Sequence, residues 1–85
     1  MESCQVNSTQ WRFEVEAVTD PQSLLRVIGY FAQRSIVPTE VAVKVAGDVM
    51  HIAIITADLP TDHAHIIEAK ISQLFVVNDV TLTHV

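Results

Sequence analysis

The chain has 85 residues, 49% of them hydrophobic and 18% charged, and its net charge at pH 7 is −5. This composition predicts one small folded domain and excludes a disordered chain. Because it contains only five lysines and arginines, it lacks the basic stripe of a nucleic-acid-binding protein and has little attraction for an anionic membrane.

Residues 1–10 are polar and predict an N-terminal tail, followed by a single domain over residues 11–85. The start lacks the positive and apolar regions of a signal peptide, and no apolar run reaches the roughly 18 residues that span a bilayer. The single cysteine, Cys4, cannot form an internal disulfide. These features favour the cytoplasm.

The first element is a strand over residues 11–18, WRFEVEAV. Apolar and polar residues alternate with period two, which is typical of a strand with one buried face. The buried face would carry Trp11, Phe13, Val15 and Ala17.

A helix follows, with Asp20 as its N-cap and Pro21 at its first position. Its apolar stripe consists of Leu24, Val27, Ile28 and Phe31, spaced i, i+3, i+4, i+7. Gly29 lies off this stripe. It is either a tolerated glycine, costing about 1 kcal/mol against alanine, or a point where another backbone approaches closely.

Residues 37–57 predict a β-hairpin that turns at Gly47-Asp48. This turn pairs Lys44 with His51 and Val43 with Ile52. One face of the hairpin would then be an apolar layer of Val41, Val43, Val45, Met50, Ile52 and Ile54. The other face would carry Glu40, Ala42, Lys44, His51, Ala53 and Ile55.

A second helix is expected over residues 59–75, with Thr61 as its N-cap and Asp62 in its first turn. Its stripe would contain Ala64, Ile67, Ile71 and Leu74. A turn at Asn78-Asp79 and a short strand through Val80 and Leu82 end the chain.

The element order is therefore β-α-β-β-α-β, which predicts an α+β, ferredoxin-like two-layer sandwich. Its antiparallel sheet would have the strand order 4-1-3-2, with both helices on one face. A domain this small buries only about 60% of its unfolded surface, which makes a partner such as a second copy a reasonable expectation.

The motifs of common enzymes and metal sites do not occur in this sequence. His63 and His65 are two residues apart on a helix and point in different directions, so we expect no metal site. Glu14 and Glu16 lie on an open strand face, which is typical of solvated surface. There is no glycine-rich phosphate loop, CxxC motif or catalytic triad, so we expect no catalytic residues and no cofactor.

The segment LLRVIGYFAQRSIVPTEVAV resembles the ACT domain, and in particular the small regulatory subunit of acetolactate synthase. Its helix matches the family pattern from Arg26 to Arg34, and the informative positions are Gly29, Gln33 and Arg34. In topology the resemblance covers residues 11–83. The pattern differs at three positions, where Thr19 replaces Asn and Gln22 and Ser35 each replace Gly.

The resemblance implies a non-catalytic regulatory module that forms a homodimer and acts on a large catalytic subunit of branched-chain amino acid synthesis. Valine or a related amino acid would bind between the protomers and act allosterically. The backbone N–H groups of Gln22 and Ser23 would offer an anion site at the helix N-terminus. The implied effector site consists of Thr19, Asp20, Gln22, Ser23, Leu24, Val37, Pro38 and Thr39.

Two alternatives remain open from the sequence. The first is an ACT-like dimerisation domain that stabilises or activates a catalytic subunit without binding an effector, which the altered position Gln22 favours. The second is a small ferredoxin-like enzyme, for which the sequence offers no convergent polar site. The strand after residue 37 has few charges to protect its edge, which independently favours self-association.

Overall fold

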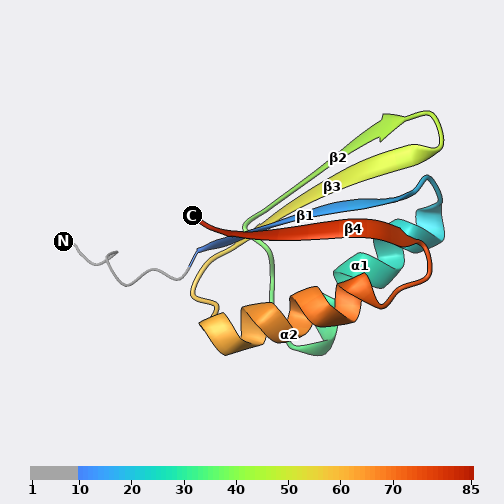
Figure 1. Cartoon of the computed structure of the whole chain (residues 1–85). Coiled ribbons are helices and arrows are strands. Elements are labelled where there is room, and N and C mark those ends of the chain that lie inside the picture. The colour runs from blue at the N-terminus through green and yellow to red at the C-terminus, as the bar shows by residue number, and fades with distance from the viewer. Residues whose placement is uncertain (1–9) are drawn as a thin grey trace.

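A computed structural model describes residues 10–85. The elements are β1 (Trp11–Val18), α1 (Pro21–Gln33), β2 (Glu40–Ala46), β3 (Val49–Thr56), α2 (Thr61–Ser72) and β4 (Val77–His84). The antiparallel sheet has the order β2-β3-β1-β4, and both helices lie on one face of it (Figure 1). This confirms the ferredoxin-like prediction, since 4-1-3-2 is the same order read from the other edge. Cys4 and the rest of the predicted tail before Gln10 lie outside the described residues.

Helix α1 begins as its sequence predicts. The Asp20 side chain accepts a hydrogen bond from the Gln22 N–H at 2.8 Å, and Pro21 occupies the first helical position. Beyond its C-terminal end, Ser35 adopts a left-handed backbone with φ +60°. The chain therefore keeps the conformation that glycine favours after a helix, although the residue there is serine.

The β2–β3 hairpin has the predicted register. Ala46 pairs with Val49, Lys44 with His51 and Glu40 with Ile55. Gly47 has φ +65°, the conformation that the first position of a type I′ or II′ turn requires.

The core lies between the inner face of the sheet and the two helices. Phe13 of β1 and Phe31 of α1 meet edge to face, with ring centroids 5.1 Å apart. The Trp11 indole N–H donates to the Leu59 carbonyl oxygen at 3.1 Å, which ties the start of β1 to the segment before α2. The largest fully buried apolar side chains are Phe13, Phe31, Ile52, Ile54, Ile67, Ile71, Val15 and Val27.

Two predicted boundaries are wrong. Thr61 is the first residue of α2 rather than its cap; the cap position is Pro60, and no side chain caps this helix end. Asn78-Asp79 lies inside β4, because the chain turns earlier, where the Val77 N–H donates to the Leu74 carbonyl oxygen. Beside these residues, the β1–β4 register shifts at Glu16/Ala17. An edge strand accepts such an irregularity because only one neighbour must match it.

Gly29 is not a point of close packing within residues 10–85. A Cβ built at this position meets no heavy atom within 4 Å. The alternative of a close backbone approach is therefore wrong for the chain by itself, because the glycine lies on the side of α1 that faces away from the core.

Candidate functional site

The loop between β1 and α1 contains the first group of predicted effector residues. The Thr19 N–H donates to the Asp48 carbonyl oxygen at 2.9 Å, so this loop is tied to the tip of the β2–β3 hairpin. Asp20 and Gln22 have exposed side chains. Leu24 is half-buried and packs against the core, so it contacts the core rather than the solvent side of the loop.

The N–H groups at the start of α1 are already used by Asp20. The Gln22 N–H donates to Asp20 Oδ1 at 2.8 Å, and the Ser23 N–H donates to the Asp20 carbonyl oxygen at 3.0 Å. In this conformation these two N–H groups are therefore not free to bind a ligand carboxylate. A ligand carboxylate would also meet the like charge of Asp20, which opposes its binding.

Ser23 faces the core rather than the solvent. The side chain is fully buried, and its hydroxyl has no hydrogen-bond partner among the described residues. A buried hydroxyl without a partner reduces stability, since it loses its bonds to water. Direct contact with an effector would require the first turn of α1 to move.

The second group of predicted residues lies at the opposite end of the sheet. Val37 is 86% exposed, Pro38 is half-buried, and the N–H and hydroxyl of Thr39 both donate to the Ile55 carbonyl oxygen. Ile55 pairs with Arg12 near the start of β1, whereas Thr19 follows the end of that strand. About 20 Å of strand separates the two groups, so one chain does not bring them together.

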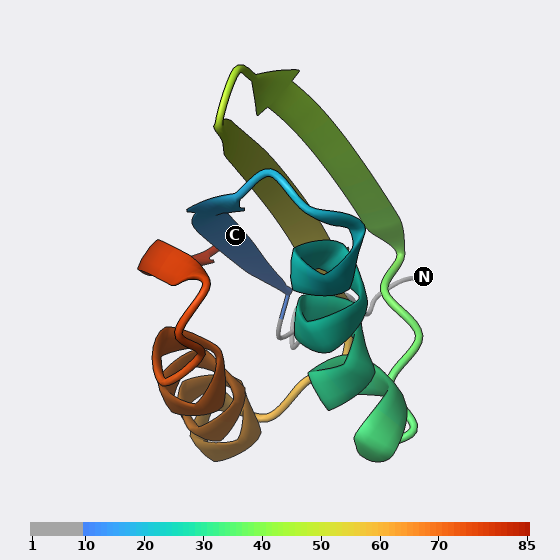
Figure 2. The ribbon, with the colours of Figure 1, turned by 90° about the vertical axis from the view of Figure 1, so that its right-hand side faces the viewer.

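Strand β2 is the most exposed element of the sheet. All seven of its residues are exposed, including Val41, Val43 and Val45, which face the helix side at 44%, 38% and 60% exposure. These three valines lie on the face predicted for them, but they stay outside the core, because the helices lie under the other strands and the hairpin reaches past them (Figure 2). We call these three residues the β2 valine patch.

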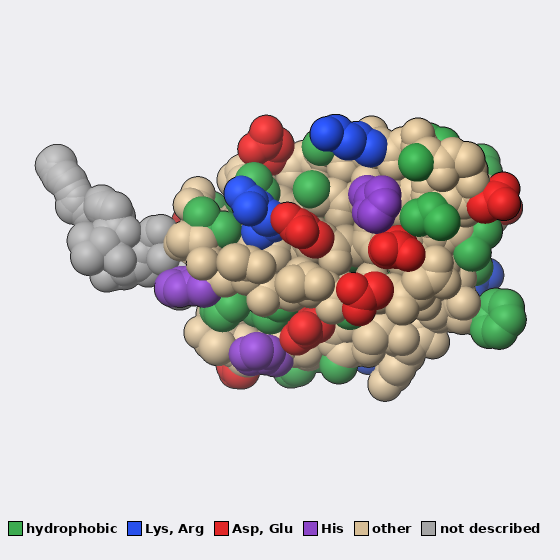
Figure 3. Space-filling model, turned by 45° about the horizontal axis from the view of Figure 1, so that its top comes forward, with side chains coloured by type: hydrophobic (Ala, Val, Ile, Leu, Met, Phe, Trp, Pro, Cys, Tyr) green, Lys and Arg blue, Asp and Glu red, His purple; other side chains and the backbone are tan. Residues whose placement is uncertain are grey.

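The outer face of the sheet carries charged, histidine and small apolar side chains together (Figure 3). It has a hollow of about 220 Å³ lined by Glu14, Val15, Ala42, Lys44, His51, Ile52 and Ala53. The Glu14 carboxylate lies 3.8 Å from the Arg12 guanidinium, and both side chains are about half exposed. Such an exposed pair contributes little to stability. Glu14 is exposed, Glu16 is half-buried and only Glu14 lines the hollow, so the two carboxylates do not share an enclosed cleft of the kind that a catalytic pair needs.

Two histidines, His65 and His84, lie beside Trp11 at the start of β1. Trp11 lies 4.7 Å from His84 and 6.0 Å from His65 between ring centroids, and His65 Nδ1 is 3.4 Å from Glu68 Oε1. Within residues 10–85, no group of three or more His, Cys, Asp and Glu residues could hold a metal ion. Neither helix of this part of the chain is long and apolar enough to cross a membrane.

Residues 4–85 match the family model described as ACT-like domain. Comparison with curated proteins found no similar sequence. The fold is similar to the ACT domain of GTP pyrophosphokinase from Chlorobium tepidum, with a TM-score of 0.77, 8% identity, and coverage of 89% of this chain and 99% of that one.

Proteins of two other organisms contain a similar fold. A homoserine dehydrogenase from Thiobacillus denitrificans has a TM-score of 0.73 and 22% identity, with 91% of this chain and 17% of that one covered. The regulatory subunit of aspartate kinase from Thermus flavus has a TM-score of 0.67 and 14% identity, with 89% of this chain and 52% of that one covered. At these identities the likeness concerns the fold alone.

Proposed function

Because the chain belongs to the ACT-like domain family, we propose that it is a non-catalytic regulatory module that acts as a homodimer. ACT domains are typically regulatory and bind amino acids. The match of Arg26 to Arg34 with the helix pattern of the acetolactate synthase small subunit supports a large catalytic subunit of branched-chain amino acid synthesis as its cytoplasmic target. The effector would then be valine, leucine or isoleucine.

The main observation that supports a homodimer is the exposure of the edge strand β2. An edge strand with unpaired backbone groups is a template for another strand, and proteins usually protect it with charges or cover it. Here the edge lies beside the β2 valine patch, whose apolar side chains no helix covers. Pairing β2 with β2 of a second copy would satisfy the open edge and remove apolar surface from water.

The same pairing would complete the effector site. β2 follows Thr39 and runs from Glu40 towards the hairpin tip, and Thr19 is tied to that tip through Asp48. An antiparallel partner strand runs the other way, so the partner's Val37 and Thr39 would lie near the tip. Residues from the two ends of the sheet, which one chain keeps apart, would then meet across the dimer.

Two measurements on the full chain test this function. Sedimentation velocity over a range of protein concentrations should show a monomer–dimer equilibrium. A thermal-shift titration with valine, leucine and isoleucine should raise the melting temperature in proportion to ligand concentration, as linkage requires, with alanine and lysine as controls. A chain that is monomeric at every concentration and does not respond to any amino acid would contradict the proposal.

A second candidate function is an interaction domain that stabilises or activates a catalytic subunit without binding an effector. Two observations favour it, since the N–H groups of Gln22 and Ser23 are already bonded to Asp20 and Gln22 occupies the position of a family glycine. The variant Gln22→Gly separates the two functions. If this variant gains amino acid binding, the glutamine side chain blocks the site in the natural chain. Co-elution of the natural chain with an acetolactate synthase large subunit, without any response to an effector, would support the interaction domain.

A further inference from the structure

The middle of β2 reads Glu40-Val41-Ala42-Val43-Lys44, a pattern that is complementary to itself when its direction is reversed. An acidic and a basic residue stand at equal distances on either side of Ala42, and two valines stand between them. In an antiparallel pair, residues at equal distances from the centre lie directly opposite each other. Such a strand therefore matches a second copy of itself.

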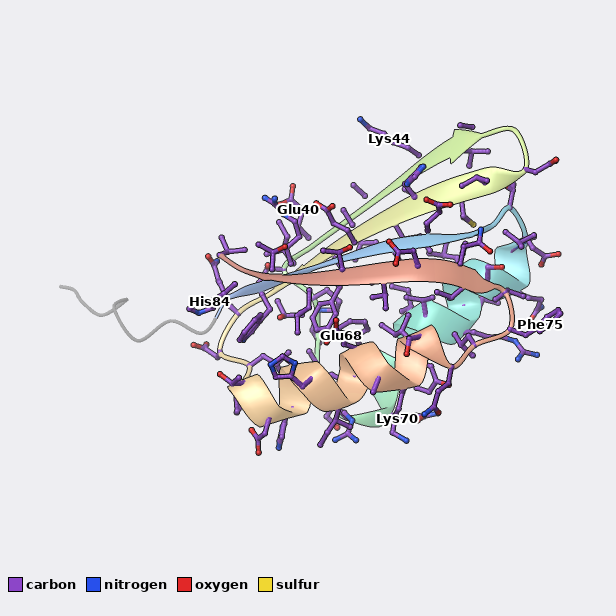
Figure 4. The ribbon with its side chains drawn as sticks, viewed as in Figure 1. Glu40, Lys44, Glu68, Lys70, Phe75 and His84 are labelled. Carbon is purple, nitrogen blue, oxygen red and sulfur yellow. The ribbon has the colours of Figure 1, made fainter. Side chains whose placement is uncertain are left out.

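Strand geometry sorts these residues by face. Glu40, Ala42 and Lys44 alternate with the β2 valine patch, so they lie on the outer face. Figure 4 shows Glu40 and Lys44 above the sheet, on the side away from the helices. Glu40 pairs with Ile55 of β3, and Lys44 pairs with His51. Among residues 10–85, neither the Glu40 carboxylate nor the Lys44 ammonium group is within ion-pair distance of an opposite charge.

We propose that β2 pairs with β2 of a second copy in the register centred on Ala42. This inference rests on the homodimer proposed above and specifies its contacts. Lys44 of each copy lies opposite the partner's Glu40, which gives two cross-strand ion pairs by symmetry. Ala42 lies opposite the partner's Ala42, where the small side chains allow the two strands to approach without crowding.

The neighbouring register, centred on Val43, is less favourable. It places Lys44 opposite the partner's Ala42 and Glu40 opposite the partner's Ala46, so both direct ion pairs are lost. Opposite charges that face each other across an antiparallel pair stabilise it, whereas diagonal neighbours are farther apart. Charge therefore selects between two registers that the backbone alone accepts equally.

The register centred on Ala42 also improves apolar packing on the inner face of the joined strands, which is the face on the helix side. Val41 lies opposite the partner's Val43, and the reverse contact follows by symmetry. The four valines form one continuous apolar cluster below the joined strands. Each of them is 38% or 44% exposed in a single copy, so the cluster removes apolar surface from water without any change of fold.

Charge reversal gives the first test, measured by sedimentation velocity. Lys44→Glu places two acidic pairs across the interface and Glu40→Lys places two basic pairs, so each variant should dimerise at least about tenfold more weakly than the natural chain. Mixing the two variants restores both ion pairs, and the mixture should form a heterodimer with nearly natural affinity. The double variant Glu40→Lys/Lys44→Glu should recover as a homodimer. Glu16→Lys on β1 is the matched control and should leave dimerisation unchanged.

Cysteine cross-linking gives the second test and reports the register directly. In a Cys4→Ser background, Ala42→Cys should form a disulfide-linked dimer on mild oxidation, because the two introduced thiols face each other across the symmetry axis. Val43→Cys should cross-link much less, since its direct neighbour is the partner's Val41. Thermal unfolding of each reduced variant verifies that the fold is intact.

The outcomes separate the register from the proposed function. Efficient cross-linking of Val43→Cys, or a mixture of charge variants no tighter than either alone, would overturn the register while dimerisation persists. A natural chain that stays monomeric would overturn both this inference and the proposed homodimer.

Discussion

Replacing Gly29 with alanine should stabilise the fold. In a helix interior, alanine is about 0.8–1.0 kcal/mol more favourable than glycine, because glycine loses more backbone freedom on folding. The new Cβ has no heavy atom within 4 Å, and the backbone at this position does not have a positive φ, so no clash or strain offsets the gain. For a domain of this size, a gain of 1 kcal/mol raises the melting temperature by about 4–8 °C.

Gly47 provides the matched control. Its built Cβ is equally free of neighbours, but its φ is +65°, a conformation that costs an L-residue about 1–2 kcal/mol. Gly47→Ala should therefore lower the free energy of unfolding while Gly29→Ala raises it. The pair isolates the effect of backbone conformation, since neither substitution creates a steric contact.

Urea unfolding followed by tryptophan fluorescence can measure both changes. Trp11 is the single tryptophan and only 8% exposed, so its emission should change when the core opens. The titrations should be repeated at several protein concentrations, because dimerisation adds to the apparent stability. If Gly29→Ala leaves the urea midpoint unchanged or lowers it at low concentration, the account of Gly29 as a helix residue with free space for a Cβ is refuted.

Five further substitutions test other parts of the structure. Asp20→Ala should lower the free energy of unfolding by about 1 kcal/mol in urea titration, since it removes the N-cap of α1, whereas Asp20→Asn should change it by only a few tenths. Ser23→Ala and Thr56→Val each remove a buried hydroxyl without a partner among the described residues, and each should raise the melting temperature measured by calorimetry. Phe31→Leu keeps an apolar residue in the core but removes the edge-to-face contact with Phe13, so it should cost about 1 kcal/mol or more by the same calorimetric measurement.

Local sequence signals predicted most of the fold. The alternation of β1, the Asp20 cap and the Gly47-Asp48 turn each act over a few residues, and the structure has all three. The prediction of a turn at Asn78-Asp79 is wrong because this pair is equally compatible with an irregular edge strand. The prediction that Thr61 is the N-cap of α2 is wrong because Pro60 occupies the cap position.

The candidate site depended on information that the sequence pattern does not contain. The alternation in β2 placed Val41, Val43 and Val45 correctly on the helix side, but it could not show that the helices leave this strand exposed. Likewise, the sequence places Ser23 at the N-terminus of α1 but does not show that its side chain is fully buried. A face can be predicted from periodicity, whereas its coverage depends on how the layers are aligned.

The overhang of the β2–β3 hairpin has a consequence for the dynamics of the chain. β2 is an edge strand that is hydrogen-bonded only to β3, and no helix packs beneath it. Its local opening therefore costs less free energy than opening of the central strands. Val37 to Thr39 leads directly into this strand and would loosen with it. A single copy would therefore fray at this edge, and association would suppress the fraying, so that protein concentration itself regulates the order of the segment proposed to meet the effector.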